Sequence, residues 1–163
     1  MRAAGELVVK AALEFRVDDL EGEAIRGLVA RHLRGMHEHS PPESVHAFDL
    51  RGLRDPAVTF WSVWAGETLA GMGALKQLDG GRGEIKSMRV ADALVGTGVG
   101  RAILDHIVGE ARRRGLTSLW LETGSSPAFA PALGLYERAG FVRCGPFDGY
   151  TDDPFSVFMT RAI

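Results

Sequence analysis

The sequence contains a single cysteine, Cys144, no long hydrophobic run and no excess of either charge. One cysteine excludes an internal disulfide and a cysteine-based zinc site, and such sparing use is typical of the reducing cytoplasm. No uninterrupted apolar stretch exceeds three residues, which excludes a membrane-spanning helix and a secretory signal at the N-terminus. A formal net charge of −2 argues against general nucleic-acid binding, which requires a basic surface. We therefore expect a cytoplasmic protein with neither a membrane nor a nucleic acid as its partner.

What the sequence does contain is enough apolar surface for one folded domain. Its 163 residues are 45% hydrophobic and 25% charged, which are ordinary proportions for a globular protein. We expect residues 1–163 to form a single domain, in which residues 1–12 are an N-terminal arm or an extra edge strand. Glycine departs from the ordinary composition, with 21 residues, and several of them gather between residues 96 and 100.

Hydrophobic periodicity predicts a mixed α/β protein. Apolar residues at intervals of three and four indicate amphipathic helices, and these span Ile25–Met36, Arg101–Arg114 and Ala128–Ala139. Asp18 and Asp19 are candidate N-caps for the first helix. Alternating or β-branched runs predict strands at Leu13–Val17, Val58–Ala65, Thr68–Leu78, Glu84–Val90, Leu116–Thr123, Phe141–Cys144 and Ser156–Arg161. An antiparallel meander followed by alternating helices and strands is neither a pure meander nor a doubly wound parallel sheet.

The glycine cluster Gly96-Thr97-Gly98-Val99-Gly100 joins a predicted strand to a predicted helix. Glycines let a ligand approach the backbone closely, and the free N–H groups of a helix start form an anion site. The spacing matches neither a P-loop nor the early dinucleotide fingerprint of a Rossmann fold. A flexible turn without a ligand is the alternative interpretation.

Two motifs together resemble the GNAT N-acetyltransferase family. The glycine cluster is similar to the family's acetyl-coenzyme A loop, [Q/R]-x-x-G-x-[G/A]. Further along, Ala132-Leu133-Gly134-Leu135-Tyr136-Glu137-Arg138-Ala139-Gly140-Phe141 is similar to the family pattern A-x-x-L-Y-x-x-x-G-F. Val95 stands where the family usually has Gln or Arg, so that backbone N–H groups would have to hold the phosphates. The segment Pro41–Ala47 further resembles a small bacterial subgroup of the family whose substrates are mostly unassigned.

The resemblance implies a twisted, mostly antiparallel sheet of six to seven strands, flanked by helices and splayed between the fourth and fifth strands. It also implies an enzyme that moves an acetyl group from acetyl-coenzyme A directly to a primary amine of a small molecule or peptide, without a metal. A homodimer is an assembly that the resemblance allows. The residues that would contact coenzyme A are Met88, Arg89, Val90, Val95, Gly96, Thr97, Gly98, Val99, Gly100 and Arg101.

The resemblance also implies two catalytic side chains. Tyr136 would donate a proton to the leaving sulfur, because a phenol is protonated at pH 7. Glu84 would draw a proton from the amine. A core aromatic on an amphipathic helix is the alternative for Tyr136, and a solvated strand end is the alternative for Glu84. Strict alternation would put Glu84, Lys86, Met88 and Val90 on one face of their strand, unless a bulge intervenes.

The acceptor side is less well marked. His46 and Trp61 lie in segments where the family builds its acceptor pocket, and they are candidate substrate contacts. His32 is expected in the core, His106 is expected to be solvated, and His37–His39 has no evident third metal ligand.

Two other functions stay open. A non-catalytic acyl-coenzyme A sensor would keep the glycine cluster but would need neither acid nor base. A transferase for larger acyl groups, or for a hydroxyl acceptor, would differ in substrate.

Overall fold

The computed structural model describes residues 13–46 and 48–163, so the proposed arm or strand of residues 1–12 lies outside the described residues. One seven-stranded sheet runs through the described part, in the order β1-β2-β3-β4-β5-β7-β6. Neighbouring strands are antiparallel except for β4 and β5, which are parallel. The strands are β1 Leu13–Val17, β2 Val58–Ala65, β3 Thr68–Gln77, β4 Arg82–Val90, β5 Ser118–Gly124, β6 Val142–Cys144 and β7 Ser156–Ala162. The fold predicted from the resemblance is confirmed.

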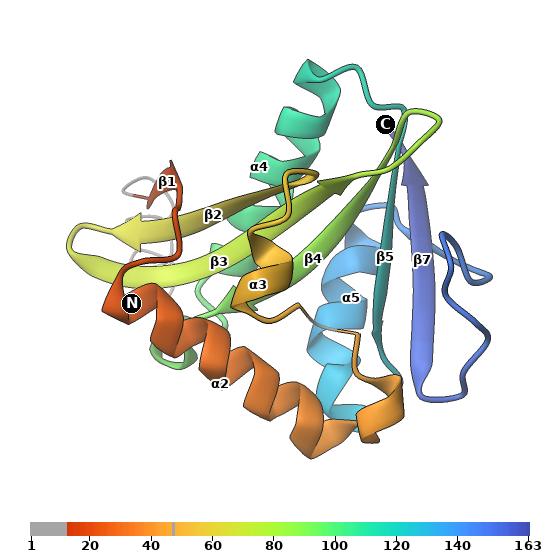
Figure 1. Cartoon of the computed structure of the whole chain (residues 1–163), viewed down its shortest axis with the longest axis horizontal. Coiled ribbons are helices and arrows are strands. Elements are labelled where there is room, and N and C mark those ends of the chain that lie inside the picture. Colours follow the sequence, from red (N-terminus) through yellow and green to blue (C-terminus); the bar gives the residue numbers. More distant parts are fainter. Residues whose placement is uncertain (1–12, 47) are drawn as a thin grey trace.

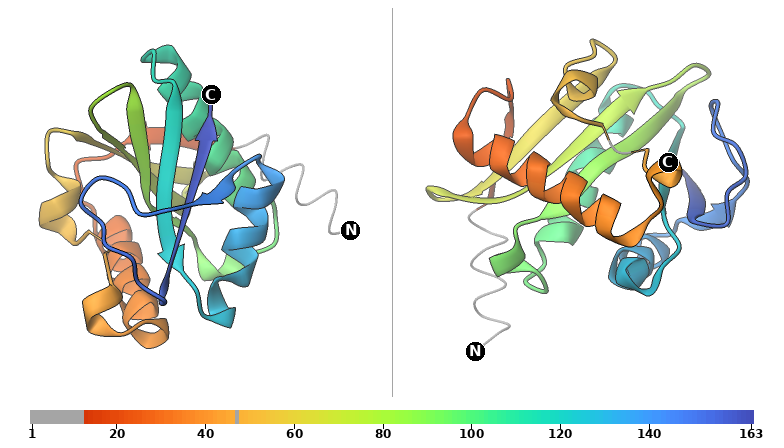
Figure 2. Two further views of the ribbon diagram at one scale, coloured as in Figure 1. Left: turned by 90° about the vertical axis from the view of Figure 1, so that its right-hand side faces the viewer. Right: turned by 60° about the horizontal axis from the view of Figure 1, so that its bottom comes forward.

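Helices cover both faces of this sheet (Figures 1 and 2). On one face lie α2 (Glu23–His39) and the short α3 (Leu50–Leu53), and on the other lie α4 (Val99–Arg113) and α5 (Ala130–Arg138). Each side has its own apolar cluster, because α2 and α4 each bury one stripe of residues at helical spacing. In the described residues, no helix has the length and apolar character needed to cross a bilayer.

The turn between β1 and α2 departs from the predicted cap. Asp18 and Asp19 accept hydrogen bonds from the backbone N–H groups of Leu20 (2.7 Å) and Glu21 (3.0 Å), and Gly22 takes the N-cap position. Leu20 adopts a left-handed φ of 65°, although its side chain is only 1% exposed. The carboxylates therefore stabilise a strained turn that inserts a leucine into the core, rather than capping the helix.

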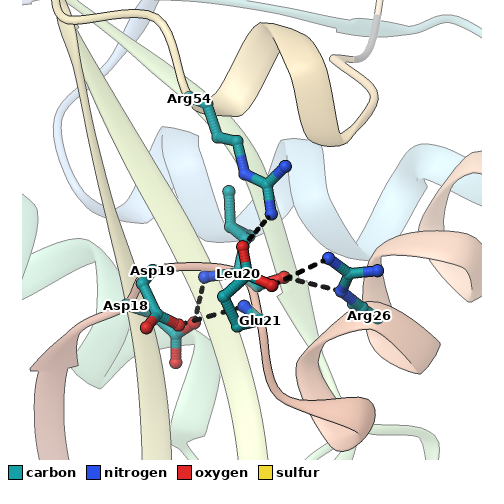
Figure 3. A network of polar contacts seen from close by, with 6 residues as sticks. All are labelled: Asp18, Asp19, Leu20, Glu21, Arg26 and Arg54. Atoms are coloured by element: carbon teal, nitrogen blue, oxygen red, sulfur yellow. Dashed lines mark hydrogen bonds and ion pairs between the residues drawn. The ribbon is translucent and has the colours of Figure 1, made fainter.

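Glu21 then links this turn to both helices on its face (Figure 3). Its carboxylate accepts from Arg54, the residue that caps α3, at 2.7 Å and from Arg26 of α2 at 3.2 Å. Arg26 also donates to the carbonyl oxygen of Leu20 at 2.8 Å.

β4 and β5 separate soon after they meet. They pair at Arg82 with Ser118, Gly83 with Leu119 and Glu84 with Trp120, and in the described residues their pairing ends there. Figure 1 shows the two strands diverging from that end. The predicted splay is confirmed, and it opens the sheet between them.

A bulge interrupts β4 at the start of the opening. Met72 pairs with Arg89 and Ala74 pairs with Lys86, so two residues of β4 lie opposite one of β3. Ser87, inside the bulge, has a φ of 52°. The bulge exchanges the faces: the Lys86 ammonium lies over Phe48 on the α2 side, whereas Met88 packs with the α4 cluster. Strict alternation, which would have put both on one face, is therefore wrong here.

Two aromatic expectations also fail. Trp61 is only 5% exposed and packs in the α4-side core, so the structure does not bring it to the acceptor side. Its ring lies edge-on to His106 at 5.0 Å, and His106 in turn stacks on Phe15 at 4.2 Å. His106 is therefore packed between aromatic rings rather than solvated, because β1 lies over that part of α4.

Candidate active site

A cavity of about 750 Å³ lies where β4 and β5 diverge. Residues of α2, β4, the glycine loop, the start of α4, β5, α5 and the segment before β7 line it. The splay therefore produces one continuous space between the two faces of the sheet.

The glycine loop forms one end of this cavity. Gly96 and Gly98 have left-handed φ angles of 81° and 92°, which favour glycine, and Gly98 is the N-cap of α4. The first hydrogen bond of the helix runs from the N–H of Ala102 to the carbonyl oxygen of Gly98, so the preceding N–H groups of the helix have no acceptor within it. Gly100 also lines the cavity, where a Cβ would lie 3.3 Å from Leu135. The loop thus offers N–H donors that have no acceptor within the helix, together with the positive end of a helix dipole.

The other predicted loop residues divide into two groups. Val95, whose side chain is 66% exposed, and Arg101 both line the cavity. Thr97 instead donates its hydroxyl to the Leu94 carbonyl, and Val99 is buried in the core. Thr97 and Val99 can therefore contact a ligand through their backbone but not through their side chains.

Met88, Arg89 and Val90 line the cavity along β4. Since β4 pairs with β5 only as far as Glu84 in the described residues, the backbone beyond that point is a sheet edge facing the opening. Amide groups of an extended ligand can pair with such an edge.

Tyr136 on α5 lines the cavity while its side chain is almost buried, at 7% exposure. Burial, and then the charge of Glu122, raise the pKa of its phenol to about 12. The hydroxyl is therefore fully protonated at pH 7 and can act as a proton donor.

Glu84 lies in a compact polar cluster with Lys86 and Tyr150. One carboxylate oxygen, Oε2, accepts from the Tyr150 hydroxyl at 2.6 Å and from the Lys86 ammonium at 3.1 Å. The ammonium also donates to the Tyr150 hydroxyl at 2.9 Å. Glu84 is thus a buried, paired carboxylate at the cavity wall, and the expectation of a solvated strand end is wrong.

His46 joins the same wall. Its ring lies edge-on to Tyr150 at 5.1 Å, and its carbonyl oxygen accepts from Lys86 at 3.4 Å. The structure therefore brings His46 together with Glu84, and leaves Trp61 outside.

Sequence reasoning missed Glu122, whose side chain also lines the cavity. Burial raises the pKa of its carboxyl to about 7, against the opposing effect of Lys86. The signal was present, because Glu122 is a charged residue inside the apolar strand Leu119–Thr123. Tyr150, also missed, comes from an irregular segment in which no periodicity marks it.

The described residues contain no cluster of three or more His, Cys, Asp or Glu side chains that could hold a metal ion. Cys144 lies on β6, and burial raises the pKa of its thiol, which disfavours the reactive thiolate.

Comparisons with known proteins identify the class to which this fold and cavity belong. Residues 23–141 match the model of the acetyltransferase (GNAT) family. The chain is 50% identical over 151 residues to the uncharacterised N-acetyltransferase YsnE of Bacillus subtilis, which covers 93% of this chain and 100% of that one. It is also 50% identical over 149 residues to the uncharacterised N-acetyltransferase YedL of Escherichia coli, covering 91% and 94%.

Solved structures agree on the fold. A proposed acyl-CoA N-acyltransferase from Klebsiella pneumoniae has a TM-score of 0.75 at 24% identity, covering 93% of this chain and 98% of the other. An acetyltransferase from Bacillus subtilis, solved in complex with CoA, has a TM-score of 0.65 at 18% identity, covering 93% and 99%. The chain therefore belongs to the GNAT family of acetyltransferases and is an acyltransferase enzyme, as the two motifs predicted.

Proposed function

We propose that this enzyme transfers an acetyl group from acetyl-coenzyme A directly to a primary amine. The observation that carries the proposal is one cavity that joins the N–H groups at the start of α4, which have no acceptor within the helix, to Tyr136 and two carboxylates. The N-acetyltransferase names of the two relatives, and the CoA complex of a structural neighbour, support the same donor.

The donor would be held mainly by backbone. The diphosphate fits the loop Gly96–Gly100, where each N–H bond to a charged oxygen contributes about 1.5–3 kcal/mol. The exposed side chain of Val95 cannot form a hydrogen bond to the diphosphate, so the backbone N–H groups at the start of α4 have to supply the polar contacts. The pantetheine amides would pair with β4 at Met88 and Val90, which directs the thioester toward the bulge. The donor supplies an activated acyl group. The residues of the chain orient this group, accept a proton from the amine and donate a proton to the leaving sulfur.

An amine acceptor must lose a proton before it can attack. An alkyl ammonium with a pKa near 10 is only ~0.1% neutral at pH 7. Glu122, whose pKa of about 7 is matched to that pH, is the better-suited base. Glu84 remains a second candidate, although its Oε2 already accepts from Tyr150 and Lys86. Because Lys86 balances the charge of Glu84, ionised Glu122 is the carboxylate that would attract a cationic acceptor into the cavity.

Tyr136 would protonate the departing thiolate. Its phenol lines the cavity from α5 and holds its proton at pH 7. Cys144, outside the cavity lining, is not placed to form an acetyl-enzyme intermediate, which supports direct transfer.

We expect Glu122→Gln to change the pH profile of the reaction. Below pH 7 the Glu122 carboxyl is protonated and cannot accept a proton, so kcat/KM of the wild type should rise with pH and level off above about 7. The variant should lose about 100-fold or more in kcat/KM, and it should lose that pH limb. Exposed Glu137→Gln is the matched control and should behave as the wild type. If Glu84→Gln removes the limb and Glu122→Gln keeps it, the base is Glu84.

The function itself is tested by release of free thiol from acetyl-coenzyme A in the presence of a panel of amines. We expect amine-dependent thiol release, and slower release from propionyl- and succinyl-coenzyme A. Binding of coenzyme A without thiol release for any amine would favour the sensor function. A faster reaction with a larger acyl donor, or with an alcohol, would assign a different transferase activity.

A further inference from the structure

A cationic corner of the cavity takes no part in the proton transfers proposed for Glu122, Glu84 and Tyr136. Arg31 from α2 and Arg89 from β4 both line the cavity there, beside His32. A methyl group at Gly35 would lie 2.9 Å from Nη1 of Arg89 and 3.1 Å from Nη1 of Arg31. The two guanidinium groups therefore meet over Gly35, where only glycine leaves them room.

The charges of this corner are incompletely balanced. Asp92 pairs with both arginines, at 3.2 Å from Nε of Arg31 and 3.5 Å from Nη2 of Arg89. Its side chain is 64% exposed, so this carboxylate is well hydrated. Two guanidinium groups and one carboxylate leave a net positive charge beside the cavity, and a guanidinium pairs well with the two oxygens of a carboxylate.

His32 is a second, independent sign of a ligand. Its side chain is buried and lines the cavity, and in the described part of the chain its Nδ1 has no hydrogen-bond partner. Burial, followed by the charges of Arg89 and Arg31, lowers the pKa of His32 to about 4. The imidazole is thus neutral at pH 7, and one nitrogen can donate to an oxygen anion placed between it and the arginines. Without such a ligand, a buried nitrogen that lacks a hydrogen-bond partner lowers the stability of the fold.

Glu84 lies on the same strand as Arg89, and Glu122 lies on the neighbouring strand β5. Lys86, whose charge acts on Glu122, precedes Arg89 by three residues, so about 10 Å of β4 backbone lies between these two residues. An acceptor that carried an ammonium group and a carboxylate would match this order of charges. A small molecule spans that distance.

We propose that the acceptor is an amino acid or a similarly small amine that bears a carboxylate, and that Arg31, Arg89 and His32 bind this carboxylate. The inference rests on the proposed function, because it identifies the acceptor class of the same site. The two arginines and His32 are binding residues. The proton of the ammonium group is still removed by Glu122 or Glu84.

The test compares acceptors in matched pairs: the common amino acids against their carboxamides, with thiol release from acetyl-coenzyme A as the readout. We expect the best amino acid to exceed its carboxamide by 10-fold or more in kcat/KM, since hydrogen bonds to charged groups are worth about 10- to 100-fold. Arg89→Gln should remove this preference by raising KM for the amino acid, with KM for acetyl-coenzyme A unchanged.

Gly35→Ala provides a variant that keeps every charge. Its methyl group would displace the ends of two flexible side chains, while alanine favours the helix, so the fold should persist. We expect it to raise KM for the amino acid about 10-fold without lowering the melting temperature. Arg112→Gln, at the exposed far end of α4, is the matched control.

Three outcomes would overturn the inference. Carboxamides could react as well as the acids, Arg89→Gln could slow both to the same extent, or it could raise KM for acetyl-coenzyme A alone, which would assign the arginines to the diphosphate. Each of these leaves amine-dependent acetyl transfer intact. Failure of every amine, with or without a carboxylate, would instead overturn the proposed function.

Discussion

Replacing Tyr136 with phenylalanine should lower kcat by about 100-fold or more, the usual contribution of a positioned proton donor. The phenol lines the cavity, and a pKa of about 12 keeps its proton available at pH 7. The ring packs edge-on to Phe141 at 5.9 Å, a contact that phenylalanine retains. We therefore expect the melting temperature and the calorimetric affinity for coenzyme A to stay near the wild-type values.

Tyr150→Phe is the matched comparison, because it removes the other phenol hydroxyl of the cavity. That hydroxyl donates to Glu84 at 2.6 Å, so its loss should act on the acceptor side and raise the acceptor KM. If Tyr136→Phe leaves kcat unchanged, Tyr136 is only a core aromatic residue.

Gly98→Glu should weaken coenzyme A binding by about 100-fold or more, measured by titration calorimetry on the folded protein. Gly98 has a φ of 92° and begins α4, so any other residue strains the backbone by about 1–2 kcal/mol. The new carboxylate would also lie where we expect the diphosphate. Losing even two N–H bonds to charged oxygens accounts for an effect of this size.

Gly109→Glu adds the same charge to the same helix and serves as the control. Among the described residues, a Cβ at Gly109 would meet only the side chain of Arg113, at an ordinary 3.6 Å. We expect wild-type affinity for coenzyme A from this control. Equal affinity in both variants would show that the diphosphate does not bind at the start of α4.

Local patterns predicted most of the elements. Strands β1 and β2 have the predicted bounds, and each of the other predicted helices and strands begins and ends within a few residues of its predicted bounds. Alternation and helical spacing depend on neighbouring residues, so they can be read without the fold. The bulge at Ser87 interrupts the alternation and puts Met88 on the other face of β4, which is the alternative that the sequence left open.

The residues of the site were predicted unevenly. The glycine loop and Tyr136 lie in motifs, and the cavity includes both. Trp61 was misplaced because alternation does not say which face of a strand will meet the acceptor. His106 was misplaced because β1 packs on a helix face that its own sequence marks as polar.

The sequence alone determined the order of elements, the glycine-rich helix start and the family, because each depends on residues that are close together in the chain. Only the tertiary structure decided the chemistry of the acceptor side. Tyr150 reaches Glu84 across 66 residues, and Lys86 reaches the His46 carbonyl across 40. The pKa values of Glu122 and His32 are shifted by burial. Burial and charge pairing depend on which segments the fold brings together, and no local pattern contains that information.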